Sequence, residues 1–300
     1  MAAKSPEPLK STAELPRVVR AKGSYLWDAT GKAYIDGSGG PAVYCLGHAN
    51  EEVNAAVAAQ MSDIAHAYRY NFTTDALEEL TEIIRAQCGG TLREMVYVTS
   101  GSEAVESCLK IALQYHTANG QKSRRKFISR QRSWHGNTLG ALGLSGFAER
   151  TAAYEGAFIP SIKLSPVNAY RPVVGADAAS VGAICAAELE AALAADSHAP
   201  TIVILNAGDL NLGQSDDFAT LIPMAQAAGA WVHVDGAFGL WLNAAPRLRA
   251  QVAGIDLCDS WATDGHKWLN TPYDAGMAIT RHGDALKASM RMTASYLTEG

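Results

Sequence analysis

Three short segments of the chain carry residue types that could do chemistry, and each follows or ends a short apolar run. Residues 99–104 read TSGSEA, and Ser100, Gly101 and Ser102 leave backbone N–H groups accessible where a helix is expected to begin. A helix start carries a partial positive charge and suits a phosphate. Ordinary capping, with a serine N-cap and an acidic residue in the first turn, explains the same pattern. The other two segments contribute a carboxylate, Asp235, and an amine, Lys267.

Asp235 and Lys267 each have a simple structural explanation when taken alone. Asp235 closes the run WVHVD and precedes Gly236, and an Asp-Gly pair is typical of a turn. Lys267 stands between His266 and Trp268, where its amine either reaches solvent from an amphipathic stem or is held away from water. A sheltered amine loses its proton more readily and becomes a nucleophile that can form a Schiff base.

Together the three segments match the needs of pyridoxal phosphate. The phosphate would bind at the helix start, Asp235 would keep the ring nitrogen protonated so that the ring accepts electrons, and Lys267 would carry the aldehyde carbon as an imine. A flat ring also needs a stacking partner, and Trp134 offers one in SWHG, just after the apolar run KFIS. The combination predicts a pyridoxal phosphate site.

Short apolar runs that alternate with helical patterns indicate the elements that position these segments. We expect two short strands within residues 25–35, helices over 51–64 and 73–87, a helix from residue 102, and another over 218–228. We expect further strands at residues 95–99, 126–129, 202–205, 231–235, 260–263 and 276–279. This alternation predicts an α/β fold with a mostly parallel sheet that helices cover on both faces. Ligands bind such sheets beyond the carboxyl ends of the strands, where all three segments lie.

Residues from about 15 to 195 resemble class III aminotransferases. The resemblance rests on four motifs in this order: AKGSYLWDATGKAYIDGSGG, LGHANEEVNAAVAAQ, YVTSGSEAVESCLKIA and SWHGNTLGAL. It implies that Gly101 and Ser102 bind the cofactor's phosphate. It also implies that Trp134 stacks on the ring, with His135 following it.

Residues from about 200 to 300 resemble a different family, the group II decarboxylases that act on glutamate and aromatic amino acids. The motifs are LNAGDLNLGQSDDF, AWVHVDGAFGLW and DSWATDGHKWLNTPYDAG. This resemblance implies that Asp235 pairs with the ring nitrogen, that Lys267 forms the imine, and that His266 helps to hold the phosphate. Both families share the aspartate-aminotransferase-like fold, pyridoxal phosphate fold type I.

The two resemblances also imply a domain organisation. Residues 1–50 would form an N-terminal arm and the strands of a small domain, and residues 51–300 the large cofactor-binding domain. A join between the two patterns would fall near residues 165–200. Both families continue beyond Gly300 into a small C-terminal domain, so we expect that domain to be absent and the chain to be a hybrid or truncated form.

Three functions follow from this pattern. The first is an aminotransferase, because more of the chain resembles that family, with Lys267 also moving a proton as general base. The second is an amino-acid decarboxylase, for which Tyr296 is a weak candidate proton donor. The third is a hybrid or fragment that binds the cofactor but is catalytically impaired. The substrate would be an amino acid, an amine or a 2-oxo acid, with Arg69 and Arg291 as candidates to bind its carboxylate.

Composition excludes several other classes of protein. The net charge of -5 argues against nucleic-acid binding, and no apolar run is long enough to span a membrane. The five cysteines are scattered without a C-x-x-C pair, so we expect no metal site, no disulfide framework and a cytoplasmic location. The start of the chain lacks the apolar region of a signal peptide. The family resemblance implies a homodimer.

Overall fold

The computed structural model describes residues 15–69, 71–88, 90–195 and 202–290. Contacts within the chain divide it into two compact units, Met1–Phe72 and Thr73–Gly300, and each is described here by itself. The predicted division into residues 1–50 and 51–300 stays a prediction about which parts bind the cofactor.

The first unit contains a small antiparallel sheet that is set by one turn. A turn at Thr30 and Gly31 joins the two strands predicted within residues 25–35. Asp28 Oδ1 stabilises it by accepting hydrogen bonds from the backbone N–H groups of Thr30 (2.9 Å) and Lys32 (3.1 Å). Gly31 has a φ of 87°, which favours glycine. The elements of this unit are β1 (Val18–Lys22), β2 (Tyr25–Asp28), β3 (Ala33–Ile35), α1 (Gly39–Ala42) and α2 (Glu51–Asp63).

The second unit is built on a seven-stranded sheet in the order β4-β10-β9-β8-β7-β5-β6. Its strands are β4 (Glu94–Val98), β5 (Phe127–Arg130), β6 (Ser161–Leu164), β7 (Ile202–Asn206), β8 (Trp231–Asp235), β9 (Ser260–Asp264) and β10 (Gly276–Thr280). Neighbours from β9 to β6 run parallel, whereas β10 is antiparallel to both β9 and β4. The prediction of a mostly parallel sheet is therefore confirmed.

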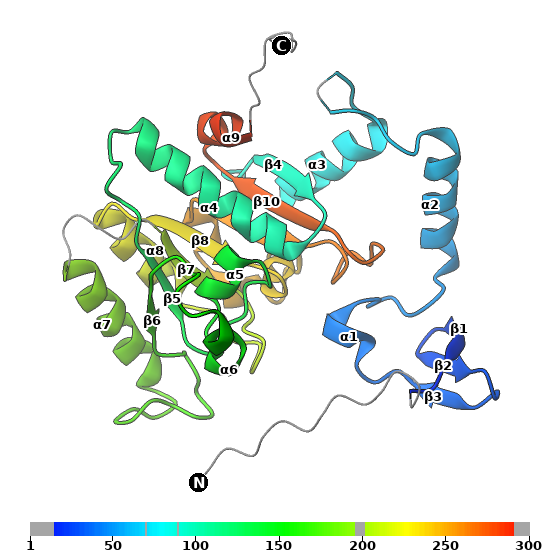
Figure 1. Ribbon diagram of the computed structural model, residues 1–300, viewed down its shortest axis with the longest axis horizontal. Coiled ribbons are helices and arrows are strands. Elements are labelled where there is room, and N and C mark those ends of the chain that lie inside the picture. Colours follow the sequence, from blue (N-terminus) through cyan, green and yellow to red (C-terminus); the bar gives the residue numbers. More distant parts are fainter. Residues whose placement is uncertain (1–14, 70, 89, 196–201, 291–300) are drawn as a thin grey trace. The chain divides into compact units, whose positions relative to one another are not determined.

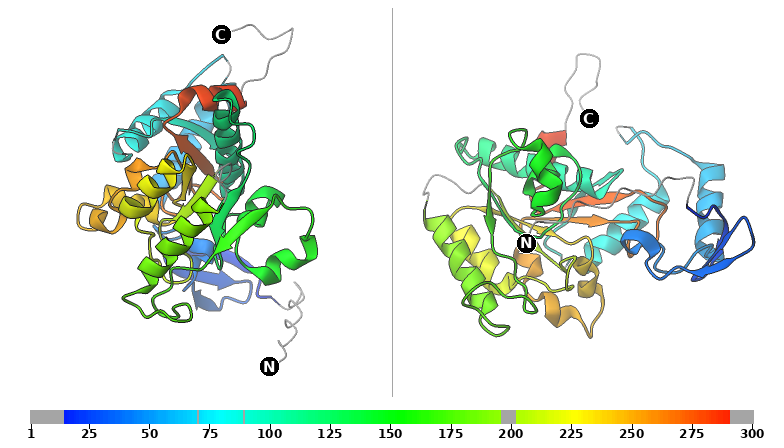
Figure 2. Two further views of the ribbon diagram at one scale, coloured as in Figure 1. Left: turned by 90° about the vertical axis from the view of Figure 1, so that its left-hand side faces the viewer. Right: turned by 60° about the horizontal axis from the view of Figure 1, so that its bottom comes forward.

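Helices cover both faces of this sheet, as predicted, because successive strand residues point to opposite sides. Ile202 and Ile204 pack in the core beneath α4 and α5, whereas Val203 and Leu205 pack in the core beneath α7 and α8. Figures 1 and 2 show α9 beside α4. The helices of this unit are α3 (Asp75–Gln87), α4 (Gly101–Ala118), α5 (Leu139–Leu144), α6 (Ala148–Thr151), α7 (Val181–Ala194), α8 (Phe218–Ala227) and α9 (Gly283–Met290).

The direction of the strands brings the predicted site to one edge of the sheet. β5, β7, β8 and β9 are parallel, so their carboxyl ends share an edge. β10 is antiparallel to both β9 and β4, so β4 runs in the same direction as β9 and its carboxyl end lies at the same edge. Asp235 ends β8, and the segments that follow β4, β5 and β9 contain the other residues predicted to bind the cofactor.

Some elements differ from the sequence-based expectation. β6 was not predicted, because its four residues carry a lysine between two apolar ones. α7 lies within residues 165–200, where the join between the two patterns is expected and no helix was predicted. Its alanine-rich sequence has no distinct polar face. No helix in the described part of the chain combines the length and the apolar character needed to cross a membrane.

Candidate active site

A buried pair of side chains, Asp235 and His135, forms the centre of the site. Asp235 Oδ2 lies 2.7 Å from His135 Nδ1, and the His135 side chain is completely buried. Burial alone raises the pKa of Asp235, but the hydrogen bond from His135 and the charges of His135 and Lys267 outweigh it, so the net direction is a lowered pKa. Asp235 is thus an ionised carboxylate at a strand end, able to pair with a protonated ring nitrogen.

His135 also has one ring nitrogen that points away from Asp235. Its Nε2 is buried and has no hydrogen-bond partner among the described residues. Its backbone N–H donates to Ser145 Oγ at 2.9 Å, which fixes this residue in the loop after β5. The sequence placed His135 only beside the stacking tryptophan, and its contact with Asp235 spans 100 positions.

The amine of Lys267 is sheltered, as one of the two sequence interpretations required. The Lys267 side chain is only 12% exposed, and its Nζ lies 2.8 Å from Asp264 Oδ2. Nζ also lies 4.0 Å from the centre of the Phe238 ring, a distance typical of a cation–π contact. The amine is therefore held inside the site rather than directed into solvent.

Asp264 is a functional candidate that the sequence analysis missed. It ends β9 as Asp235 ends β8, and this common position at a strand's carboxyl end was the available signal. Burial raises the pKa of Asp264, an effect that Lys267 opposes. A Cβ atom on Gly101 would lie 2.0 Å from Asp264 Oδ1, so the carboxylate stands directly against the start of α4.

The start of α4 shows the capping that the sequence offered as one of two interpretations. Ser100 is the N-cap, and its Oγ accepts from the backbone N–H of Glu103 at 3.1 Å, while Glu103 Oε2 accepts from the backbone N–H of Thr99 at 2.9 Å. The capping interpretation is therefore correct for Ser100. Ser102 Oγ instead accepts from the backbone N–H of Asn137 at 3.0 Å, which ties α4 to the loop after β5.

Glycines allow these backbone segments to approach closely. A Cβ on Gly136 would lie 2.5 Å from Ser102 Oγ, and a Cβ on Gly276 would lie 2.2 Å from the Ser100 carbonyl oxygen. The start of α4 therefore rests between β10 and the SWHG loop. Binding of a phosphate by Ser100, Gly101 and Ser102 stays a prediction.

Trp134 and His266 make contacts other than those predicted for them. The Trp134 ring is partly buried and carries the Arg150 guanidinium 4.6 Å from its centre. His266 Nδ1 pairs with Asp274 Oδ1 at 2.5 Å, and its ring meets the edge of Tyr273 at 4.6 Å. Ring stacking by Trp134 and phosphate binding by His266 stay predictions.

The candidate residues for a substrate carboxylate are not placed at the site. Arg69 belongs to the first compact unit, whose position relative to the site is not defined. Arg291 and the candidate proton donor Tyr296 lie outside the described residues.

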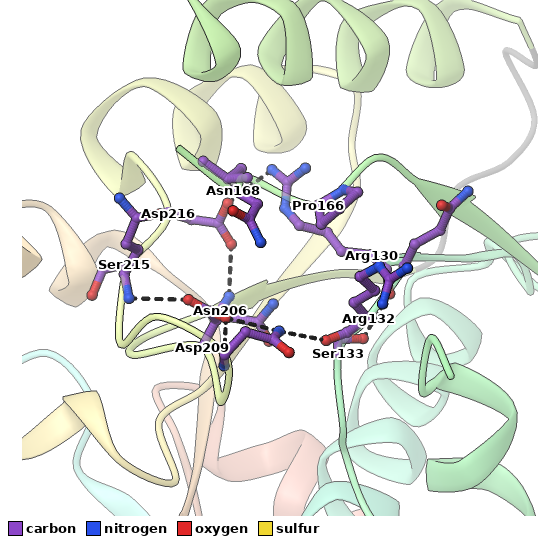
Figure 3. A pocket seen from close by; sticks show the side chains of 13 residues that line it. Arg130, Arg132, Ser133, Pro166, Asn168, Asn206, Asp209, Ser215 and Asp216 are labelled. Atoms are coloured by element: carbon purple, nitrogen blue, oxygen red, sulfur yellow. Dashed lines mark hydrogen bonds and ion pairs between the residues drawn. The ribbon is translucent and has the colours of Figure 1, made fainter. Parts of the chain in front are cut away.

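A second polar cluster, not predicted from the sequence, lies at the ends of β5 and β7. Arg130 and Asp216 line a small pocket whose volume is about 20 Å³. Figure 3 shows the side chains around it. Arg130 Nη2 lies 2.8 Å from Asp216 Oδ1, and their side chains are 4% and 3% exposed. Arg130 Nη1 also donates to the Ser165 carbonyl at 3.0 Å, and Asp216 Oδ2 accepts from the Asn206 backbone N–H at 2.8 Å. The volume holds about one water molecule, so this pair is structural.

Comparison with known families divides the chain as its motifs do. Residues 10–206 match the model of class III aminotransferases, and residues 175–300 match the conserved domain of pyridoxal-dependent decarboxylases. The two matches overlap over residues 175–206. The join predicted near residues 165–200 remains a prediction.

Curated relatives of the chain carry aminotransferase names as well. The uncharacterized aminotransferase YodT of Bacillus subtilis is 43% identical over 45% of this chain and 30% of its own length. Acetylornithine aminotransferase of Clostridium acetobutylicum is 32% identical over 54% of this chain and 42% of its own length. The chain therefore matches less than half the length of these curated relatives.

Structural similarity extends over nearly the whole chain. An amine transaminase from an uncultivated Pseudomonas species superimposes with a TM-score of 0.80 and 21% identity, covering 99% of this chain and 71% of that protein. A transaminase from ancestral reconstruction superimposes with a TM-score of 0.82 and 21% identity, covering 95% of this chain and 65% of that protein. These likenesses establish fold type I, and the family match covers well over half of the sequence. The chain belongs to the class III aminotransferase family.

Proposed function

We propose that this protein is a pyridoxal phosphate-dependent aminotransferase that acts on an amino acid or amine and a 2-oxo acid. The observation that carries the proposal is the sheltered amine of Lys267, beside two carboxylates at the strand edge where α4 begins. Taking a lysine amine out of water costs hydration free energy, so a lysine kept in these surroundings supports a role in the chemistry of the site.

The residues present fit this cofactor at its three anchoring points. The start of α4, with Gly101 and Ser102, would hold the phosphate, since helix N-termini bind anions. Asp235 would pair with the ring nitrogen, which its lowered pKa and its hydrogen bond with His135 support. Lys267 would hold the aldehyde end. When bound, the cofactor supplies an aldehyde that condenses with amines and a ring that accepts electrons.

The side chains of this chain have distinct tasks in that reaction. Lys267 Nζ would take a proton from the α-carbon of the substrate, because it is the amine within the site. His135 would orient Asp235 and keep it charged through the 2.7 Å hydrogen bond. Phe238, whose ring lies under the amine, would exclude water from the side of Lys267.

Decarboxylation is the second candidate function. The specific observation in its favour is the match of residues 175–300, which include Lys267, to the pyridoxal-dependent decarboxylase domain. We rank it second because the residues that precede the lysine segment, including the start of α4 and the SWHG loop, match the aminotransferase family.

A single-turnover experiment separates the two functions. The purified full chain, loaded with pyridoxal phosphate, is mixed with a pool of amino acids and amines, and products are followed by mass spectrometry. An aminotransferase produces pyridoxamine phosphate and a 2-oxo acid or a carbonyl compound, without carbon dioxide. Carbon dioxide without pyridoxamine phosphate would make the protein a decarboxylase. Neither product from a chain that has bound the cofactor would indicate an impaired hybrid. Lys267→Met is the matched control.

We also propose that the protein is a homodimer. The family resemblance implies this state, and within the first compact unit α2 buries none of its thirteen residues. A helix that buries no side chain there gains little stability by itself and needs a further packing partner, which a second copy would supply. Light scattering should give twice the mass of one chain. A monomer that binds the cofactor stoichiometrically would contradict this proposal.

We propose a cytoplasmic location on the chemistry of the cysteines. All five are free thiols, and four of them are buried. Burial raises the pKa of Cys88 and Cys108 to about 12, so both remain protonated and unreactive. Free thiols suit a reducing compartment. Cell fractionation checks this, and recovery from a secreted fraction would contradict it.

A further inference from the structure

The carboxylate of Asp264 makes two contacts that matter for cofactor binding. Its Oδ1 stands 2.0 Å from the position of a Cβ on Gly101, at the first residue of α4. Its Oδ2 lies 2.8 Å from Lys267 Nζ, and the Asp264 side chain is 8% exposed. One buried carboxylate therefore covers the start of the helix and holds the amine.

These are the places that the proposed function assigns to the cofactor. α4 has eighteen residues, and its N-terminus attracts an anion. The acidic side chain on its own first turn, Glu103, is turned to Thr99, so Asp264 is the carboxylate that stands against Gly101. A phosphate at the same helix start would meet Asp264 as a like charge, which is unfavourable in a buried site.

We propose that Asp264 holds the place of the cofactor's phosphate in the protein without cofactor, so that loading requires this carboxylate to lose its charge or turn away. The inference rests on the proposed function, because it is the phosphate of pyridoxal phosphate that Asp264 opposes. Asp264 is thus a positioning residue that controls entry of the cofactor and release of Lys267.

The charged groups around Asp264 determine how it responds to pH. Lys267 and His266 in the following turn favour its charged form, whereas Asp235 on β8 disfavours it. Asp274, from the segment before β10, contributes another carboxylate, since the ligand atoms of Asp264, His266 and Asp274 lie within 4.8 Å of one another. Burial is the largest influence and raises the pKa of Asp264. Asp264 therefore takes up a proton at a higher pH than a solvated carboxyl, and anion binding improves as pH falls.

Sulfate tests this without depending on enzyme activity, because it remains a dianion over the pH range used. The full chain, stripped of cofactor, is titrated calorimetrically with sulfate at pH 8 and pH 6. At pH 8, Asp264→Asn should bind sulfate roughly tenfold more tightly than the unchanged protein. A neighbouring charge shifts a binding equilibrium by about tenfold to a thousandfold, and we take the smallest of these effects. The difference should shrink as the pH is lowered from 8, because the raised pKa of Asp264 lets it take up a proton at a higher pH than a solvated carboxyl. The rate of pyridoxal phosphate uptake, followed by absorbance, should change in the same way.

Asp284→Asn is the matched control, because it removes one exposed carboxylate beyond the opposite end of β10. Its sulfate affinity should stay within about twofold of the unchanged protein, as expected for a screened surface charge. Asp264→Ser replaces Asp264→Asn if the latter does not fold. Equal sulfate affinity and equal uptake rates in the unchanged protein and the Asp264 variant would overturn the inference. If the cofactor does not attach to Lys267 in any variant, the proposed function fails instead, whatever sulfate does.

Discussion

Asp216→Asn should destabilise the second compact unit strongly, because it leaves the buried Arg130 guanidinium without its counter-charge. The two side chains are 4% and 3% exposed and their charged atoms lie 2.8 Å apart. Removing one partner of a buried pair costs about 3–5 kcal/mol, a large part of the roughly 5–15 kcal/mol by which a folded protein is stable. The asparagine keeps an oxygen for the Asn206 backbone N–H, so the loss reports the missing charge. The unfolding temperature should fall by roughly 10 °C.

Urea unfolding measures the free energy of unfolding for each variant. Glu82→Gln is the matched control, since its partner Arg85 forms an exposed pair in the same unit and such pairs contribute under about 1 kcal/mol. The double variant Arg130→Met with Asp216→Leu should recover most of the loss, because neither charge is then left buried. A loss under about 1 kcal/mol for Asp216→Asn, or a double variant as unstable as the sum of the single changes, would refute this reasoning.

This ion pair also tests whether the two matched segments fold as one unit. Arg130 lies only in the aminotransferase match, and Asp216 only in the decarboxylase match. A strong coupling between them would mean that the segments stabilise each other across the overlap.

The remaining predictions concern the site and its support. Asp235→Asn should weaken cofactor binding about tenfold, from the roughly 1–1.5 kcal/mol by which a charge-assisted hydrogen bond exceeds a neutral one; unchanged binding and turnover would show that this assignment is wrong. Burial lowers the pKa of Lys163 from 10.5 to about 7. Between about pH 7 and 10.5 the unfolded chain therefore carries a proton on Lys163 that the folded chain lacks. The free energy of unfolding should rise with pH in this range, by up to about 1.4 kcal/mol per pH unit. Denaturant titrations at pH 7, 8 and 9 should show no such rise in Lys163→Met, whereas the control Lys110→Met should keep it. A rise that persists in Lys163→Met would show that Lys163 is not its cause. Gly276→Ala should destabilise the protein by about 1–3 kcal/mol in the same assay, because its Cβ would lie 2.2 Å from the Ser100 carbonyl oxygen, and a neutral effect would show that the two segments separate freely.

The sheet could be predicted from the sequence because its strands are short apolar runs between helical patterns. The strand order could not, since β10 inserts between β4 and β9 through contacts that no local pattern encodes. The missed strand β6 shows the limit of periodicity, because Lys163 interrupts its apolar pattern and is held by Ser129 Oγ and the Gly143 carbonyl, both from other elements.

Asp235 and Lys267 could be identified because a strand end places a polar residue where ligands bind. Asp264 satisfied the same rule, but the predicted strand stopped at residue 263 and no role was assigned to Asp264. Its importance depends on Gly101, which is brought against it only by the fold. The role of His135 likewise depends on a partner 100 positions away. Residue type and position therefore predicted the anchors of the site, and tertiary contacts were needed for the groups that orient them.

Attachment of the cofactor to Lys267 is the most direct test of the central claim. The full chain is incubated with pyridoxal phosphate, reduced with borohydride and mapped by peptide mass spectrometry. We predict a pyridoxyl label on Lys267, lost in Lys267→Met. A label on another lysine, above all the partly buried Lys163 with its pKa of about 7, or the absence of any label, would contradict the account.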